Sequence, residues 1–424
     1  RARGALGSME KYGKFCAGRS KPELAEIIQQ EQSHVSIVAD GGHCSRRLCD
    51  DDARVIVDGV MMAGLLVESV SLRNHALGDS GASEIGRLLK FGGDDGEDVS
   101  SVELSHYHPV TSSLDLRGNS IGAAGCEALS TAMAQNSTLR KLDLSWNPLG
   151  KQGGYRIAEL LSSTSSCLTE VDVGASSLDL SALVAILSVL RNPCCLKTLN
   201  ISGAVLKTTE QEDNLASHIG SALAMNSTLE TLQCETNRIN DDGATIIAEA
   251  LRKKNRTLTT LSLRANRIRA AGAAAFSDTL ILRGSDGTLQ NLDLCSNQIG
   301  DEGAAYLSEA LSRDASLTHL DLAKNAIADE GLNELAQALA VNKQLKLMKA
   351  WGNDFGPKAN ETFHNFQTTP PFKRNNPGLR FDFKTYVVDG KICTAEQKIT
   401  VIPQVTPRDS ADDIFYEDDE DDDN

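Results

Sequence analysis

The chain has 424 residues, of which 41% are hydrophobic and only 4% aromatic, and its formal net charge is −16. This composition permits a core of aliphatic side chains, while the acidic balance argues against nucleic-acid binding, which requires a basic surface. No apolar run reaches the ~18 residues of a membrane span, and the ten cysteines show no metal-binding spacing. We therefore expect no membrane contact, no metal, no cofactor, and free thiols in a cytosolic or nuclear compartment.

The first 33 residues are expected to form a terminal segment that covers the start of the fold. Residues 1 to 8 begin without methionine, resemble an added or upstream stretch, and are excluded from the prediction. A capping helix is predicted from Lys21 to Gln32, with Ser20 as its N-cap and Pro22 in its first turn.

From residue 34 to residue 356 the chain repeats one phrase, and most copies are 28 or 29 residues apart. The phrase is clearest in the segment 289–310, where L-x-x-L-x-L-x-x-N-x-I is followed by glycine and then by alanine and leucine at helical spacing. The hydrophobic period therefore changes from two to about 3.6 inside each unit, which indicates a short strand, a turn and a helix. The asparagine position of successive copies is occupied by Asn119, Asn147, Ser176, Ala204, Asn237, Asn266, Asn297, Asn325 and Asn353.

The first two copies depart from the phrase. In one, Val35 and Ile37 are aligned with the strand leucines and Asp40 with the asparagine, and in the next His75 takes the asparagine position. An insertion from residue 91 to residue 111 follows, rich in Gly, Asp and Ser, and it is expected to be a surface loop.

Simple geometry predicts how these units stack. The strand leucines point inward, and the asparagine satisfies backbone groups where the chain leaves the sheet. Parallel strands lie ~4.8 Å apart, whereas packed helices need about 8–10 Å, so the stack must bend. The sequence predicts an α/β solenoid shaped like a horseshoe, with parallel strands on the concave face and helices on the convex face.

This unit resembles the ribonuclease-inhibitor class of leucine-rich repeats. The resemblance covers residues 34–356 and implies the fold, but it says little about function.

After the array, residues 357 to 408 are expected to form an extension, in which Asp389 and Gly390 lie between two apolar runs and predict a β-hairpin. The hairpin is expected either to pack near the last repeat or to reach for a partner. Its sequence, FKTYVVDGKICTAE, is similar to the end of a vertebrate leucine-rich repeat protein, which implies an intracellular setting in nucleoli or in ciliated and germ cells. Residues 409 to 424 carry ten acidic side chains and are expected to be a disordered tail, either a docking strip or a solubility tail.

Three positions in each repeat are predicted to face the cavity, where they form an acidic band with basic residues at intervals. The predicted partner-binding residues are Asp115, Arg117, Asp143, Trp146, Asp172, Glu235, Arg264, Asp293, Asp321, Lys349 and Trp351. One interpretation is a surface for a basic or mixed-charge protein, with the two tryptophans as anchors. In the other, the aspartates are solvated or paired with neighbouring basic residues, and the tryptophans cover leucines.

A curved surface presents rows of side chains rather than the converging groups of an active site. The sequence therefore predicts no catalytic residue and a non-enzymatic scaffold that binds another protein. The protein is expected to be a monomer or a component of a larger assembly, and a ciliary, axonemal or nucleolar complex is the expected setting. The alternative is a Ran-type GTPase-activating protein, since that family shares this repeat class and an acidic tail. The resemblance implies an Asp-Ile-Phe-Thr-Gly-Arg-like loop in an early repeat, whereas the insertion 91–111 contains no arginine. The third hypothesis, a sensor region of an innate-immune receptor, ranks last, because the sequence shows N- and C-terminal extensions and no nucleotide-binding domain.

Overall fold

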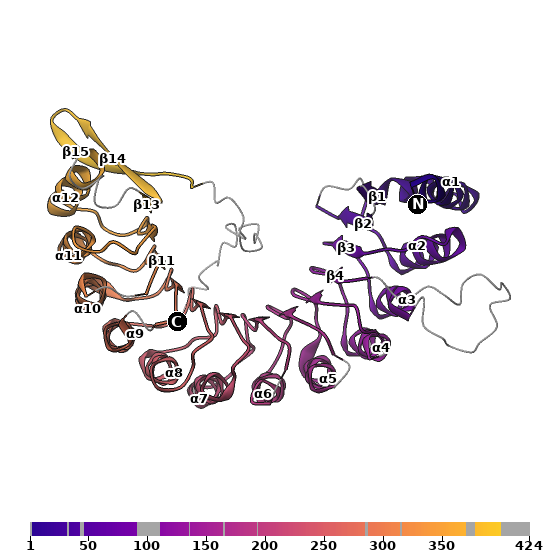
Figure 1. Cartoon of the computed structure of the whole chain (residues 1–424), viewed down its shortest axis with the longest axis horizontal. Helices are drawn as coiled ribbons and strands as arrows, with labels where there is room; N and C mark the ends of the chain where they lie inside the picture. The colour runs from indigo at the N-terminus through magenta and orange to yellow at the C-terminus, as the bar shows by residue number, and fades with distance from the viewer. Residues whose placement is uncertain are drawn as a thin grey trace, which may run out of the picture.

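The computed structural model describes residues 2–31, 34–42, 46–90, 111–134, 136–163, 166–192, 194–284, 287–313, 316–369 and 378–399. These residues form an open arc in which the strands line the inner side and the helices cover the outer side (Figure 1). The predicted horseshoe is therefore confirmed.

Within the described residues, the inner side of the arc is one sheet of thirteen strands that follow each other in sequence order. The strands β1 and β2 pair in antiparallel fashion, and each later neighbour is parallel. The strands are β1 (Ile28–Glu31), β2 (His34–Asp40), β3 (Ser69–Arg73), β4 (Ser113–Asp115), β5 (Lys141–Asp143), β6 (Glu170–Asp172), β7 (Thr198–Asn200), β8 (Thr231–Gln233), β9 (Thr260–Ser262), β10 (Asn291–Asp293), β11 (His319–Asp321), β12 (Leu347–Lys349) and β13 (Arg380–Phe381).

The outer layer consists of helices that each contact the next one along the chain. They are α1 (Ala2–Gly18), α2 (Asp50–Ala63), α3 (Asp79–Lys90), α4 (Ala123–Met133), α5 (Gly150–Ser162), α6 (Leu180–Val189), α7 (Thr209–Met225), α8 (Asp241–Lys253), α9 (Ala270–Arg283), α10 (Gly300–Ser312), α11 (Asp329–Leu339) and α12 (Pro357–Thr368). Among the described residues, no helix combines the length and the apolar character needed to cross a bilayer.

The core lies between the sheet and the helices and runs through every repeat. Leu292 of β10 is in register with Leu261 on one side and Leu320 on the other, so equivalent leucines stack along the arc. Leu292, Leu294 of the following turn and Leu307 of α10 are each no more than 2% exposed. Burial of each such side chain contributes about 1.5–3 kcal/mol, and this repeated contribution holds the slices together.

The asparagine of each turn joins one repeat to the one before it. The Asn297 side-chain amide donates to the Leu263 carbonyl of the preceding repeat at 3.0 Å and to the Leu294 carbonyl at 2.9 Å. Its Oδ1 atom accepts from the backbone N–H of Ile268 at 3.0 Å. The prediction that this position satisfies turn backbone groups is confirmed, and Ser176 does part of the same work by donating to the Leu144 carbonyl at 3.0 Å.

A second set of bonds between repeats was not predicted. Oδ1 of Asp241, in the first turn of α8, accepts from the backbone N–H groups of Arg269 and Gly272 at the start of α9, at 2.7 and 2.8 Å. A Cβ atom at Gly272 would lie 2.8 Å from this oxygen, so only glycine leaves room for the carboxylate. Asp50, Asp79, Asp301 and Asp329 accept backbone N–H groups of the next repeat in the same way.

At the N-terminus the predicted helix from Lys21 to Gln32 is wrong. A short 3-10 helix, Pro22–Ile27, is followed by β1, and its N-cap residue is Lys21 rather than Ser20. The sheet edge explains the difference, because residues 28–31 pair with β2 and cover backbone groups that would otherwise be open. The helix at this end is α1, which begins inside the segment excluded from the prediction.

The alignment of the first repeat also needs correction. Ile37 and Ala39 of β2 are in register with Val70 and Leu72 of β3, so the predicted alignment of Val35 and Ile37 with the strand leucines is displaced by two residues. A displacement of two keeps the same residues on the buried face, which is why the apolar alternation did not reveal it.

The repeat pattern continues beyond residue 356. Helix α12 packs on α11, and β13 pairs in parallel with β12, with Phe381 opposite Met348. The predicted hairpin corresponds to β14 (Phe383–Val388) and β15 (Lys391–Glu396), with Asp389 and Gly390 at positive φ in its turn. The predicted insertion, apart from Thr111, and the acidic tail lie outside the described residues.

Candidate functional site

The eleven predicted binding residues lie on strands of the long sheet or within three residues after them, and these strands line the inner side of the arc (Figure 1). Each strand alternates its side chains, so the residue between two buried leucines, such as Asp293 between Leu292 and Leu294, points away from the core. Asp115, Asp143, Asp172, Asp293, Asp321 and Lys349 end their strands, Arg117, Glu235, Arg264 and Trp351 lie two residues after a strand, and Trp146 lies three residues after one. The structure thus places them in rows along the array rather than in one pocket.

The aspartates of this surface have a structural role that the sequence analysis missed. Oδ1 of Asp143 accepts from the backbone N–H of Ser145, and Oδ1 of Asp293 accepts from that of Cys295, both at 2.9 Å. Asp115, Asp172 and Asp321 make the same bond to the residue two positions later. An aspartate that bonds the backbone two residues on stabilises a turn, and the repeated L-D-L spelling was the available signal.

Toward the C-terminal end of the array, acidic and basic side chains form a compensated network. Nζ of Lys349 lies 3.1 Å from Oδ2 of Asp321. Burial, and then the charge of Asp321, raise the pKa of the Asp293 carboxyl to about 7. The pKa of Arg264 is raised because its acidic neighbours outweigh the opposing effect of burial. These groups therefore hold one another, and they do not form a nucleophile–base pair.

A second ion pair on the inner face lies near the N-terminal end of the array. Nε of Arg73 donates to Oδ2 of Asp115. Burial and the nearby Asp143 carboxylate raise the pKa of Asp115, and Arg73 opposes this effect. For Asp115 and Asp321 the second interpretation of the sequence, pairing with adjacent basic residues, describes the geometry.

The two tryptophans differ sharply in their surroundings. Trp351 packs against the hydrophobic core, and its backbone N–H donates to the Asp382 carboxylate at 3.2 Å. Trp146 is 44% exposed and has a φ of 57°. Trp351 therefore belongs to the end of the core, whereas the Trp146 ring is available at the rim of the inner face.

Comparison with known proteins agrees with this architecture. A family profile described as "Leucine Rich repeat" matches residues 112–130, 135–158, 254–277, 288–308 and 314–336. Pig (Sus scrofa) ribonuclease inhibitor is 23% identical over 278 residues, which cover 60% of this chain and 57% of that protein. The chain is a leucine-rich repeat protein of the ribonuclease-inhibitor type. Mouse (Mus musculus) NACHT, LRR and PYD domains-containing protein 12 is 29% identical over 217 residues, covering 51% of this chain and 20% of that protein.

The leucine-rich repeat array spans about a fifth of the length of the NACHT, LRR and PYD relatives that it matches. Among solved structures, a chain of the yeast Rad7 and Elc1 complex superimposes with a TM-score of 0.45 at 15% identity, covering 87% of this chain and 86% of that one.

One group on the inner face of the leucine-rich repeats has the residue types of a metal site. Ligand atoms of Asp293, Cys295 and Asp321 lie within 4.8 Å of one another. Burial raises the pKa of the Cys295 thiol to about 11, and Lys349 and Arg264 already balance the carboxylates. We therefore assign this group to the charge network rather than to a cation.

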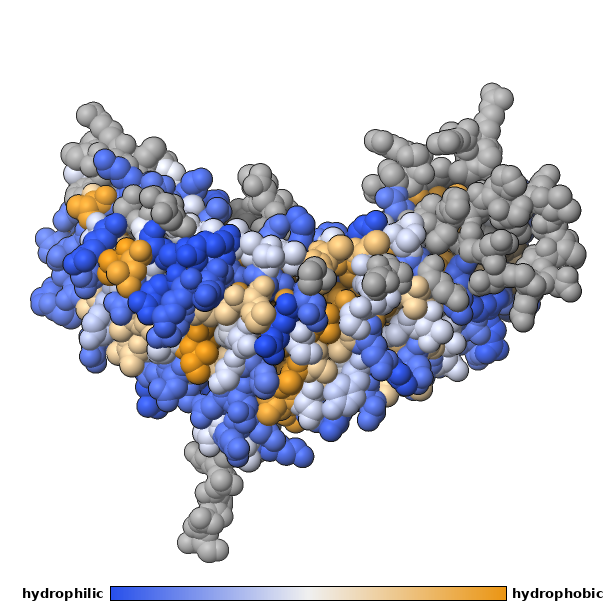
Figure 2. Space-filling view, turned by 60° about the horizontal axis from the view of Figure 1, so that its bottom comes forward, coloured by the Kyte–Doolittle hydropathy of each residue, from blue (hydrophilic) through white to orange (hydrophobic). Residues whose placement is uncertain are grey.

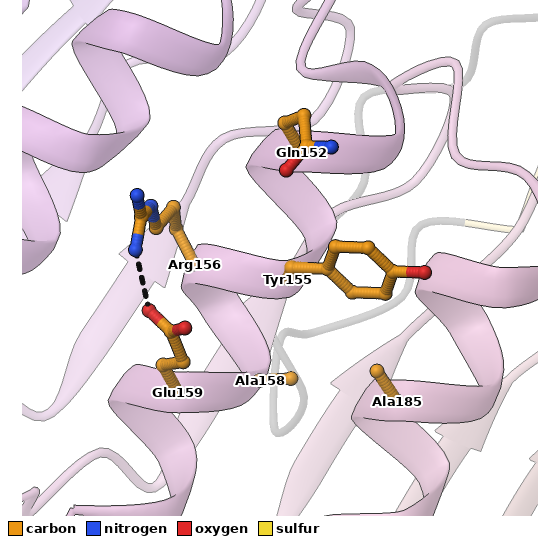
Figure 3. A pocket seen from close by; sticks show the side chains of 6 residues that line it. All are labelled: Gln152, Tyr155, Arg156, Ala158, Glu159 and Ala185. Atoms are coloured by element: carbon orange, nitrogen blue, oxygen red, sulfur yellow. Dashed lines mark hydrogen bonds and ion pairs between the residues drawn. The ribbon is translucent and has the colours of Figure 1, made fainter.

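The outer face of the array carries charge pairs between neighbouring helices, such as Arg54 with Glu84 and Arg156 with Glu127. Figure 2 shows it as a mainly hydrophilic surface with separate apolar patches. A shallow pocket between α5 and α6 is lined by Gln152, Tyr155, Arg156, Ala158, Glu159 and Ala185 (Figure 3). Arg156 is paired with Glu159 at 2.9 Å on the same helix. The polar groups that line the pocket are therefore those of an ordinary exposed helix surface.

Proposed function

We propose that this leucine-rich repeat protein is a non-enzymatic scaffold that holds a partner protein on the concave face of its array. The observation that carries the proposal is the inner face itself, where strands β4 to β12 follow one another in one continuous sheet and the residue that ends each strand, such as Asp143 or Asp172, alternates with buried apolar residues. A preformed curved surface binds a large area with little loss of conformational entropy. The name of the pig ribonuclease inhibitor states that this relative acts on another protein, which supports the same use here.

The proposed partner is a basic or mixed-charge protein, bound through the eleven residues predicted from the sequence. The inner face carries acidic side chains with basic ones at intervals, and complementary charge on a partner steers association and selects partners. We also propose a cytoplasmic setting, with an assembly of the ciliary axoneme or of the nucleus and nucleolus as the further settings to be tested. The free thiols of the nine cysteines within the described residues are compatible with a reducing compartment. The GTPase-activating alternative stays a prediction, since the loop on which it depends lies outside the described residues.

The proposal is tested with a partner recovered by proximity labelling of the full-length protein in cells. We expect the double charge reversal Asp143→Lys and Asp172→Lys to weaken binding of the purified partner by at least roughly tenfold, because like charges would meet across the interface. The matched control is Glu127→Lys and Glu249→Lys, which make the same charge change on outer helices α4 and α8.

Thermal unfolding of both variants shows whether the fold is retained, since Asp143 and Asp172 also bond their turns. Unchanged affinity in the folded inner-face variant, or a loss confined to the outer-face control, would contradict the concave-face proposal. Turnover of a small substrate by the purified protein would contradict the non-enzymatic part.

A further inference from the structure

We propose that the middle of the concave face, from β5 to β8, receives an arginine-containing extended segment of the partner, with a guanidinium group stacked on the Trp146 ring. The inference rests on the proposed scaffold function and adds to it a place and a chemical class of partner.

The position of Trp146 is not explained by the fold. The equivalent residue of each repeat has positive φ, and this set is Asn74, Gly118, Trp146, Ala175, Gly203, Thr236, Ala265, Ser296, Lys324 and Gly352. The backbone is held there by the sheet, since the Trp146 N–H donates to the Gly174 carbonyl at 2.9 Å. The left-handed region disfavours a bulky side chain, at a cost of about 1 kcal/mol. A 44% exposed indole fills no core, so neither backbone nor packing favours tryptophan here.

The inner face after Trp146 carries mostly small side chains. In the next two repeats the corresponding positions are occupied by Gly174 and Ala175 and then by Ser202 and Gly203, before Glu235 follows β8. Strands of a sheet are spaced ~4.8 Å apart, so β5 and β8 are about 14 Å apart. That length matches about four residues of an extended chain. The inner face from β5 to β8 thus has an indole ring at one end and a carboxylate at the other.

The charge of this stretch is of one sign. Its twelve inner-face positions are Asp143, Ser145, Trp146, Asp172, Gly174, Ala175, Asn200, Ser202, Gly203, Gln233, Glu235 and Thr236, which carry three acidic side chains and no lysine or arginine. The nearby Lys141 is already paired with Glu170 at 2.8 Å. On either side the inner face contains basic residues, such as Arg117 and Arg264. Charge complementarity therefore favours a cationic partner segment in the middle of the array and not at its ends.

Arginine fits this surface better than lysine. Its planar guanidinium stacks on an indole ring and makes forked bonds to a carboxylate, whereas the compact ammonium of lysine does neither as well. Tryptophan is also the aromatic side chain that attracts cations most strongly and is a favoured anchor of protein interfaces.

The test uses the full-length protein and three synthetic nine-residue peptides in which every third residue is Arg, Lys or Glu, with Gly and Ser between. At physiological salt we expect the Arg peptide to change tryptophan fluorescence and to bind more tightly than the Lys peptide, and the Glu peptide not to bind. Trp146→Leu and Trp146→Asn should each weaken the Arg peptide by roughly fivefold or more. Asn already occupies the equivalent position at residue 74, so the second variant retains the fold.

Glu235→Gln is expected to weaken the Arg peptide, and the matched control Glu249→Gln, on the outer face of α8, is expected to leave its affinity unchanged. Equal affinity of the Arg peptide for the parent and for Trp146→Leu, or equal binding of the Arg and Lys peptides, would overturn the inference. The natural partner separates the two proposals. If the natural partner no longer binds the variant with charge reversal at Asp143 and Asp172 but still binds Trp146→Asn, the scaffold function stands and this inference fails.

Discussion

At the scale of single residues, the carboxylates of the inner face show how one side chain meets both structural and electrostatic demands. Oδ1 of Asp293 closes its own turn through Cys295, while burial and the charge of Asp321 act against its ionised form. Such a residue stabilises its turn through the hydrogen bond to Oδ1, and it destabilises the folded state when its buried carboxylate is ionised. The same backbone bond recurs in Asp143, and there too the next strand brings an aspartate, Asp172 of β6, alongside.

This balance gives a pH-dependent prediction. The pKa of Asp293 is raised from 3.8 to about 7 in the fold, first by burial, so the folded state keeps a proton that the unfolded chain loses between these values. Its contribution to stability therefore falls as pH rises through this window. Asp293→Asn keeps the turn acceptor and removes the charge, and we expect it to raise the unfolding free energy by about 1–2 kcal/mol at pH 8. The gain should be small at pH 4.5.

Urea unfolding at the two pH values measures the difference between variant and parent. The low-pH measurement is the internal control, because Asp293 is still protonated in the folded protein at pH 4.5 and this pH lies near the start of the window, before most of the pH-dependent loss of stability. A gain that is equal at both values, or larger at pH 4.5, would show that Asp293 is not held neutral by its surroundings.

At the scale of helices and strands, a helix start is often stabilised by a residue of the preceding repeat. Where an aspartate stands two residues before the glycine that recurs in the first turn of the helices, as in α3 and α8, its carboxylate accepts backbone N–H groups of the next helix. Where alanine stands there instead, at residues 123 and 270, the next helix begins with glycine in the left-handed region, Gly150 or Gly300. The N–H of that glycine donates to a turn carbonyl of the following repeat. These two arrangements occur beside ordinary N-caps, in which a side chain of the same repeat accepts from the first turn, as Asp179 does in α6 and Asn240 in α8.

The carboxylate link predicts a difference between two adjacent aspartates. Asp241→Ala removes the acceptor of two backbone N–H groups at the start of α9, and we expect it to lower the unfolding free energy by about 1–2 kcal/mol. Asp242→Ala makes the same charge change at the exposed neighbouring position and should cost less than about 0.5 kcal/mol. Denaturant midpoints of the two variants test this, and equal losses would mean that charge at the helix start matters and the bonds do not.

Sequence reasoning reached the repeated elements but not the links between them. The strand leucines and turn asparagines recur in one frame, so their roles followed from spacing alone. The aspartate link joins residues about 30 positions apart, and its effect appears only when two helices are placed side by side. At the C-terminal end, Ala359, Phe363 and Phe366 lie at helical spacing in α12, but four prolines from residue 357 to residue 378 obscured the pattern.

At the scale of the whole molecule, each repeat contacts its neighbours, so damage should remain local. The C-terminal end is held by aromatic packing, in which the Phe363 ring lies 4.9 Å from that of Phe383 and 5.7 Å from that of Phe381. Phe363→Ala is expected to cost about 3–5 kcal/mol and to reduce amide-exchange protection in α12 and β13 to β15 while leaving α5 to α7 unchanged.

Hydrogen exchange followed by mass spectrometry resolves these regions. Phe276→Ala in α9 is the matched comparison, since it removes an equally buried phenylalanine from the middle of the array and should lower protection on both sides of it. Uniform loss of protection along the chain in Phe363→Ala would show that the array unfolds as one unit.

For the molecule as a whole, the curved architecture was predictable because strands and helices differ in spacing. The placement of charge was only partly predictable. Register between neighbouring strands decides that Lys349 pairs with Asp321 and that Arg73 pairs with Asp115. The amino-acid sequence alone does not specify this register. Trp351 and Trp146 looked alike in sequence, and only the position of β13 beside β12 showed that the first belongs to the core.

The two edge strands of the long sheet differ from the strands between them, and this difference affects how the sheet could pair with another molecule. The first strand runs against its neighbour, and the last one is two residues long before the chain turns off into a separate hairpin. A parallel stack with bare margins would be a template on which further molecules polymerise into filaments. Among the described residues, the brief strand at one margin leaves few open backbone groups, and the reversed strand at the other breaks the parallel pattern, so neither margin repeats the pairing of the strands between them.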